Sequence, residues 1–166
     1  MNPTIRPLEK NDWAALRDLR LFALQTEPGV YCSSYEREGA LGEADWITRI
    51  IGPGKRLFGL VAGNELVGIT GVVPLSTDHW GATAELVMSY ILPPYRRQGL
   101  SALLYDARLR WARAQPSLRW LRSRIETRTS RPGVRASVTD SSWCAAARGC
   151  GTTEFWPTKY STSFLC

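Results

Sequence analysis

Residues 84–114 constrain the fold of this chain more than any other stretch. They read as an apolar strand, a Pro93-Pro94 pair that ends it, a short basic loop with one glycine, and an amphipathic helix. A tight loop that leads into a helix N-terminus presents several backbone N–H groups to one point, where the helix dipole also favours an anion. The stretch therefore predicts a strand–loop–helix cradle for phosphate groups.

The residues of the loop suit this role. It runs Arg96-Arg97-Gln98-Gly99-Leu100-Ser101. Gly99 permits close approach of a ligand to the backbone, and Ser101 is small. Arg96 and Arg97 add positive charge for the phosphates. The alternative is a basic turn that only connects a strand to a helix, and the flanking strand and helix favour the cradle.

The helix after Gly99 is predicted from apolar residues at the spacing i, i+3, i+4 and i+7, with arginines mainly on the other side. We expect this second face to carry Arg108, Arg110 and Arg113. The remaining elements are expected as a strand at 4–7, a helix capped by Asn11, a structured loop at 30–42, a helix at 43–51, strands at 56–62, 65–75 and 84–92, and a strand that starts near 117. This order predicts a mixed α/β fold in which a parallel crossover surrounds the cradle.

The loop at 30–42 has two open interpretations. It is a plain connection between helices, or it forms the wall of an acceptor site with Ser33, Ser34 and Tyr35, because binding residues concentrate on such loops. The one histidine, His79, lies in a polar loop and is interpreted as a surface residue.

Composition excludes some classes of protein. No apolar run approaches the roughly 20 residues of a membrane span, and the start lacks a signal pattern. The four cysteines show no zinc-type spacing, so we expect no metal and a reducing, cytoplasmic location. The formal charge of +6 permits either a nucleic-acid surface or a local site for an anionic cofactor. No aromatic-rich sheet or helix-turn-helix pattern supports the nucleic-acid alternative.

The cradle resembles motif A of the GNAT superfamily of acyl-CoA-dependent N-acetyltransferases, whose pattern is Arg/Gln-x-x-Gly-x-Gly/Ala. Here the pattern starts at Arg96, and Ser101 replaces the last small residue. Ile91, Pro93 and Tyr95 match the usual approach to the motif, and the likeness covers about residues 4–121. It implies a single N-acetyltransferase domain over 1–166, with a mixed, mostly antiparallel sheet flanked by helices, whose central parallel strands splay apart.

The resemblance also implies the coenzyme and its contacts. Acetyl-CoA would place its pyrophosphate on the loop from Arg96 to Ser101, and its pantetheine would pair with the backbone near Ile91 and Leu92. Backbone amides at a bulge of the same strand would stabilise the developing oxyanion. The amine acceptor must lose a proton to attack the thioester, and Glu85, at the start of the strand, is the candidate base. No tyrosine that could act as general acid is assigned.

The tail at 126–166 departs from the family. It is rich in Ser, Thr, Arg and Cys and shows no period. We hypothesise a frame-shifted translation that begins near Arg122. The alternative is a divergent but folded C-terminus. With permitted codons, the neighbouring frame reads HRDANQPSRRASQRHGFKL and continues to QVFYELLV, which contains the Asn, the Gly-Phe turn and the last strand that the family implies. The coding DNA tests this, since early stops in that frame would exclude it.

The sequence thus predicts an N-acetyltransferase that moves an acetyl group from acetyl-CoA directly to a primary amine of a small molecule or peptide. Two alternatives are a catalytically weakened acyl-CoA-binding protein of the same fold and a basic nucleic-acid-binding module. An unpaired sheet edge would favour a homodimer.

Overall fold

The computed structural model describes residues 2–123, which lie within one compact unit, Met1–Glu126. Residue 1 and residues 124–166 are outside the described part of the chain. The predicted frame-shifted tail at 126–166 falls there, so the hypothesis about it and the single domain over 1–166 stay predictions.

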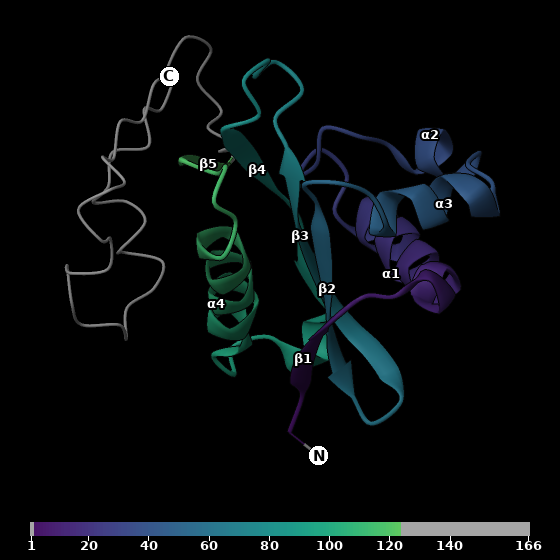
Figure 1. The fold of residues 1–166 in the computed structure, drawn as a ribbon. Helices are drawn as coiled ribbons and strands as arrows, with labels where there is room; N and C mark the ends of the chain where they lie inside the picture. The colour runs from purple at the N-terminus through teal and green to yellow at the C-terminus, as the bar shows by residue number, and fades with distance from the viewer. Residues whose placement is uncertain (1, 124–166) are drawn as a thin grey trace, which may run out of the picture. The chain divides into compact units, whose positions relative to one another are not determined.

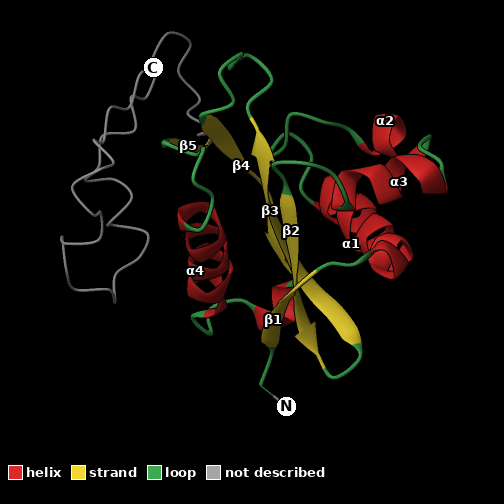
Figure 2. Ribbon diagram, viewed as in Figure 1, coloured by secondary structure: helices red, strands yellow, loops and turns green. Residues whose placement is uncertain are grey.

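A mixed sheet of five strands forms the centre of this unit (Figures 1 and 2). The strands lie side by side in chain order: β1 (Thr4–Pro7), β2 (Arg56–Ala62), β3 (Glu65–Pro74), β4 (Thr83–Ile91) and β5 (Trp120–Ser123). Neighbours are antiparallel except β4 and β5, which are parallel, with Thr83 opposite Trp120 and Leu86 opposite Ser123. The mixed, mostly antiparallel fold and its parallel crossover are therefore confirmed. The predicted splay would involve residues after 123 and stays a prediction.

Helices cover both faces of the sheet. They are α1 (Trp13–Thr26), α2 (Tyr35–Gly39), α3 (Glu43–Ile50) and α4 (Leu100–Arg113), with short 3-10 turns η1 (Lys10–Asp12) and η2 (Pro93–Tyr95). Figure 1 shows α4 on one side of the sheet and α1 to α3 on the other. Each face has its own apolar cluster. The first joins α1 and α3 to the sheet through Leu16, Leu19, Trp46, Ile50, Leu57 and Ile69, and the second joins α4 through Leu60, Val67, Leu100 and Leu104.

The hairpin between β2 and β3 forms as predicted. Ala62 pairs with Glu65, so only Gly63 and Asn64 make the turn. Gly63 has a φ of 61°, a left-handed value that suits glycine in a two-residue hairpin turn. The helix predicted at 43–51 is also present as α3, and its Trp46 and Ile50 point into the core as expected.

Three predictions are wrong. Asn11 was expected to cap the first helix, but it lies in η1, and the N-cap of α1 is Asp12. The stretch 30–42 was expected to be a loop, but Tyr35–Gly39 is a short helix, which Ser34 caps by accepting a hydrogen bond from the N–H of Arg37. Arg108 was expected on the exposed side of α4, but it is 7% exposed, whereas Arg110 is exposed. Arg108 follows Leu104 by four positions, so it shares the buried face of the helix.

None of the helices within residues 2–123 combines the length and the apolar character that a membrane crossing needs.

Candidate active site

The loop between β4 and α4 turns sharply in front of the helix. After η2, two residues have left-handed backbone, Arg97 at a φ of 62° and Gly99 at a φ of 74°. Gly99 is the N-cap of α4. A Cβ atom on Gly99 would meet nothing within 4 Å, so the space in front of this residue is open. Its φ favours glycine, and the absence of a side chain leaves room for a ligand.

The first amides of α4 have no acceptor inside the helix. The N–H of Ala102 donates to the carbonyl of Gly99 at 3.1 Å, whereas Leu100 and Ser101 lie before the first helical acceptor. Leu100 is buried against the sheet and anchors the turn, and Ser101 is exposed. The structure therefore places Gly99, Leu100 and Ser101 together at one helix N-terminus, where their contact with a coenzyme stays a prediction.

Arg96 lies beside the loop, but its side chain is directed elsewhere. Its Nε donates to the carbonyl of Ile91 at 2.8 Å, and its Nη2 forms an ion pair with Glu27, which follows α1. The hydrogen bond to Glu27 raises the pKa of Arg96, and the guanidinium also lies 5.2 Å from the ring centre of Tyr90. In this structure Arg96 joins the loop to α1. Its predicted part in phosphate binding stays a prediction.

The other predicted coenzyme residues flank the loop. Arg97 is exposed, and Gln98 donates from its side chain to the carbonyl of Pro94 at 3.0 Å. Ile91 pairs with Gly68 of β3, and the N–H of Leu92 donates to Val67 at 2.9 Å. Backbone groups of this strand end thus already bond to β3, so a coenzyme would have to pair with the opposite edge of β4.

Strand β4 carries a bulge. Ile69 lies opposite Tyr90 and Gly71 opposite Val87, so Thr70 of β3 faces both Met88 and Ser89. Met88 has a φ of 56°, an uncommon value for a residue with a side chain. A bulge of this kind turns backbone N–H and C=O groups away from the ladder. The sequence indicated such a bulge only through the family resemblance.

Glu85 lies on the same strand as the bulge. It is opposite Val73 of β3 and Arg122 of β5, and it is half-buried. Alternation along the strand puts Glu85 and Val87 on the same face of the sheet. A Cβ on Gly71 would contact both Val87 and Leu57, and Leu57 belongs to the apolar cluster under α1. The carboxylate therefore stands on the face that α1 to α3 cover. Its role as base stays a prediction.

Two of the three residues predicted for the acceptor wall, Ser33 and Ser34, make hydrogen bonds that hold α2 in place. Ser34 caps this helix, Ser33 hydrogen-bonds to the buried Glu38, and Tyr35 is 42% exposed. No pattern in the sequence pointed to Tyr31. Its hydroxyl donates to the carbonyl of Ser89 at 3.3 Å and so joins this segment to the bulge.

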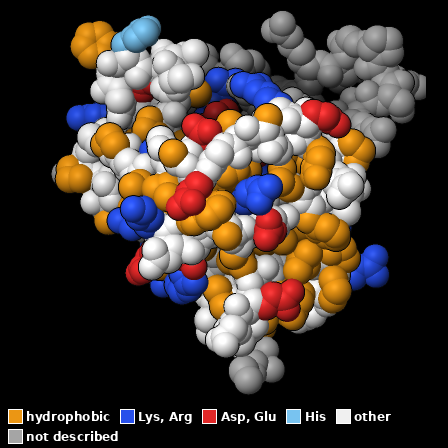
Figure 3. Space-filling model, turned by 90° about the vertical axis from the view of Figure 1, so that its right-hand side faces the viewer, with side chains coloured by type: hydrophobic (Ala, Val, Ile, Leu, Met, Phe, Trp, Pro, Cys, Tyr) orange, Lys and Arg blue, Asp and Glu red, His pale blue; other side chains and the backbone are white. Residues whose placement is uncertain are grey.

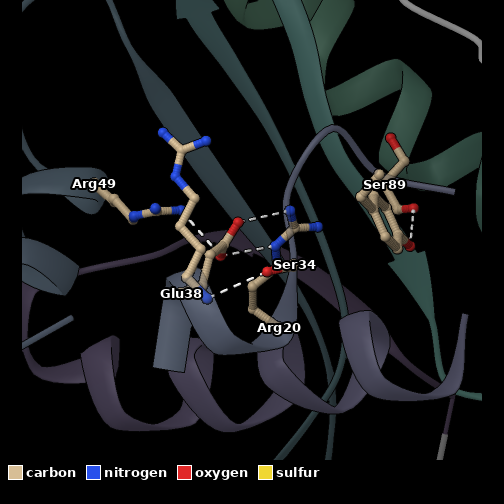
Figure 4. A network of polar contacts seen from close by, with 7 residues as sticks. Arg20, Ser34, Glu38, Arg49 and Ser89 are labelled. Carbon is tan, nitrogen blue, oxygen red and sulfur yellow. Dashed lines mark hydrogen bonds and ion pairs between the residues drawn. The ribbon is translucent and has the colours of Figure 1, made fainter. Parts of the chain in front are cut away.

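A buried ion-pair cluster holds the three helices of this face together (Figure 4). Glu38 of α2 accepts from Nε and Nη2 of Arg20 on α1, at 3.1 Å and 3.0 Å, and from Arg49 of α3 at 3.2 Å. Burial opposes ionisation of Glu38, but the hydrogen bonds and charges of the two arginines outweigh it and lower the pKa of its carboxyl. The cluster therefore stays charged at neutral pH.

Sequence comparison identifies the family. The model of the acetyltransferase (GNAT) family matches residues 13–132. This chain is a GNAT protein. The family match makes it an acyltransferase, and the mixed sheet with flanking helices agrees with that assignment. Among curated protein sequences, none matches this chain.

Several solved structures share the fold. The acetyltransferase of the GNAT family from Streptococcus pneumoniae has a TM-score of 0.62 at 20% identity, over 77% of each chain. AAC(6')-Iy, solved with the bisubstrate analogue CoA-S-monomethyl-acetylneamine, has a TM-score of 0.57 at 19% identity, over 100% of each chain. A predicted acetyltransferase from Clostridium acetobutylicum, solved with acetyl-CoA, has a TM-score of 0.56 at 13% identity, over 93% of this chain and 94% of its own. At these identities the likeness concerns the fold.

Proposed function

We propose that this GNAT protein transfers the acetyl group of acetyl-CoA directly to a primary amine. The observation that carries the proposal is one continuous segment: β4 holds the bulge and leads through η2 to the open helix N-terminus at Gly99. The bulge offers backbone groups for a reacting carbonyl, and the helix end offers amides for a pyrophosphate. The relative from Clostridium acetobutylicum, solved with acetyl-CoA, supports the choice of coenzyme.

The chemistry follows from these positions. The coenzyme phosphates bind at Gly99, Leu100 and Ser101, and pantetheine runs along β4 past Leu92 and Ile91. The amine gives a proton to Glu85, directly or through a water, and its lone pair attacks the thioester carbon. Collapse of the tetrahedral intermediate breaks the C–S bond, and coenzyme A leaves as a thiolate. The thiolate takes up the second proton that the nitrogen loses, which gives the free thiol and the acetylated amine.

The acceptor proposal is an amine with several positive charges. Residues 27–45 contain five acidic residues and one basic residue in a chain of formal charge +6. Arginines outside this segment pair with Glu27 and Glu38, so the three remaining carboxylates and Arg37 give a net charge of −2. Glu36 and Glu43 of this segment are exposed, and Figure 3 shows acidic side chains among hydrophobic and basic ones on the side of α1 to α3. A similar fold is that of an aminoglycoside acetyltransferase solved with sisomicin, with a TM-score of 0.58 at 14% identity. We therefore include aminoglycosides and polyamines among the first acceptors to test.

Coenzyme binding is tested by thermal shift. Acetyl-CoA at 100 times its Kd should stabilise the protein by about 2.7 kcal/mol. Gly99→Asp should abolish this shift, because it places a carboxylate and a strained φ at the helix end. Gly63→Asp is the matched control: its φ is also left-handed and its Cβ position is also open, but it lies in the β2–β3 turn. A shift with DNA and none with acetyl-CoA would refute the proposal.

Catalysis is tested by thiol release with a panel of amines. Glu85→Gln should keep the thermal shift and lower kcat by about 10²–10⁴-fold, the usual contribution of a general base. Glu65→Gln, at the exposed start of β3, is the control. Unchanged turnover in Glu85→Gln would exclude Glu85 as the base. Binding without turnover for any amine would favour the alternative, a weakened acyl-CoA-binding protein.

A further inference from the structure

Ser89 is held from both faces of the sheet. On the α1 side, its backbone carbonyl accepts from the hydroxyl of Tyr31 at 3.3 Å. On the α4 side, its Oγ accepts from Nη1 of Arg108 at 2.8 Å and lies 3.1 Å from Oγ1 of Thr70. Ser89 follows Met88, the bulge residue with a φ of 56°. The side chain that the bulge adds to this face is therefore fixed in place.

Arg108 is an unusual partner for a serine. It is 7% exposed, and in residues 2–123 no carboxylate pairs with it. Within the same residues its Nε has no hydrogen-bond partner, and its other close contact is the ring of Tyr105 at 5.4 Å. Burial lowers the pKa of Arg108 to about 10, so the guanidinium stays protonated at neutral pH. Its positive charge is thus directed at Ser89 and is not neutralised nearby by the described residues.

The two hydrogen-bond neighbours of Ser89 Oγ limit which bonds its hydroxyl can still form. A guanidinium has only donors, so the bond from Arg108 uses a lone pair of Ser89 Oγ. When Thr70 donates into the second lone pair, the Ser89 proton is left for another acceptor. Thr70 is 1% exposed and Arg108 is 7% exposed, whereas Ser89 is exposed. Ser89 is therefore the member of this cluster that a bound molecule can reach.

We propose that Ser89 is a catalytic residue whose hydroxyl donates a hydrogen bond to the oxygen of the reacting acetyl group, and that Arg108 is its positioning residue. This inference rests on the proposed function. When the amine forms the C–N bond, the π electron pair of the carbonyl moves to oxygen, and the Ser89 hydroxyl stabilises that oxyanion. When the intermediate collapses, the C–S bond breaks and its electron pair leaves on sulfur. Ser89 keeps its proton throughout, and the charge of Arg108 strengthens its hydrogen bond.

The first test replaces the hydroxyl. Ser89→Ala should lower kcat by about 10²-fold, the lower end of the loss from removing one oxyanion donor. The KM for acetyl-CoA and the thermal shift should stay unchanged. Ser89→Thr retains a hydroxyl and should recover most of the activity. Ser76→Ala, in the exposed loop before β4, is the control that should behave as wild type.

A double-mutant cycle tests the role of Arg108. Arg108→Gln should lower kcat by about 10-fold, and the control Arg110→Gln, exposed on the same helix, should not. In the Ser89→Ala background, Arg108→Gln should add no further loss, because residues that act as one unit are not additive. If the two losses multiply, Arg108 does not act through Ser89.

The outcomes separate this inference from the proposed function. An active wild type with a fully active Ser89→Ala variant overturns the inference alone. A wild type that neither binds acetyl-CoA nor releases thiol with any amine overturns both. If Arg108→Gln fails to fold, the Ser89→Ala and Ser89→Thr pair still decides the role of the hydroxyl.

Discussion

Two buried arginines on opposite faces of the sheet differ in how their charge is matched. Arg20 is 5% exposed, and Glu38 accepts two hydrogen bonds from its guanidinium. Arg108 is 7% exposed and donates to the hydroxyl of Ser89, with no carboxylate partner in the described residues. A guanidinium neutralised by a carboxylate mainly holds elements together, whereas one bonded to a hydroxyl keeps its field for a neighbouring group. Arg20 therefore stabilises the packing of its helices, and we propose that Arg108 serves the reaction.

The largest expected effect is on stability at Glu38. Glu38→Ala leaves two arginines without their carboxylate, and breaking a buried ion pair in this way costs about 3–5 kcal/mol of unfolding free energy. Arg108→Gln removes a charge without leaving a buried carboxylate behind, so its loss should be clearly smaller. Urea denaturation of both variants measures the difference. An equal or larger loss for Arg108→Gln would show that the two arginines do not differ as proposed.

The next effect is on acid stability. Glu38 has a folded-state pKa below its ordinary value of 4.5, because the arginines outweigh the opposing effect of burial. Its ionised form therefore contributes stability above about pH 4.5, and this contribution is lost as pH falls through the lower, folded pKa. Glu38→Gln should flatten the acid side of the stability curve, measured by urea denaturation at several pH values. Arg108→Gln should leave that side unchanged. If the stability of Glu38→Gln fell with pH as steeply as that of the wild type, Glu38 would not be the group responsible.

The smallest expected effect on stability is at Tyr31, whose hydroxyl bonds to the carbonyl of Ser89. Tyr31→Phe removes the hydrogen bond to the carbonyl of Ser89 and should cost about 0.5–1.5 kcal/mol. Burial, and after it the charge of Glu27, raises the pKa of Tyr31 from 10.0 to about 12. The neutral phenol therefore stabilises the fold below pH 10.0, and this contribution is lost as pH rises toward about 12. The difference between wild type and Tyr31→Phe should shrink over that interval. A difference that grows with pH would refute this.

Much of the fold was predictable because it depends on neighbours along the chain. Gly63-Asn64 specifies a hairpin turn, Pro93-Pro94 ends a strand, and Gly99 begins a helix. The failure at 30–42 has a different cause. Tyr35–Gly39 is too short to be stable by itself, and it is held by the bonds of Glu38 to Arg20 and Arg49, which lie in other helices.

The candidate site also has parts that depend on neighbours along the chain and parts that depend on distant segments. The open helix end at Gly99 was predicted, but the direction of Arg96 was not, because Glu27 binds it from a segment far along the chain. Ser89 and Arg108 were missed. A signal for Arg108 was present, since its spacing from Leu104 and Trp111 places it on the apolar face of α4.

Local patterns in the sequence specify the order of the elements, the strand–loop–helix unit around Gly99 and the family resemblance, because turns, caps and periodicity act over a few residues. Which polar groups are buried, and which charge each one meets, follows only from the folded arrangement. Those outcomes depend on packing between segments distant in the chain. Two arginines that look alike in the sequence therefore become a structural ion pair at Arg20 and a partner for an exposed hydroxyl at Arg108.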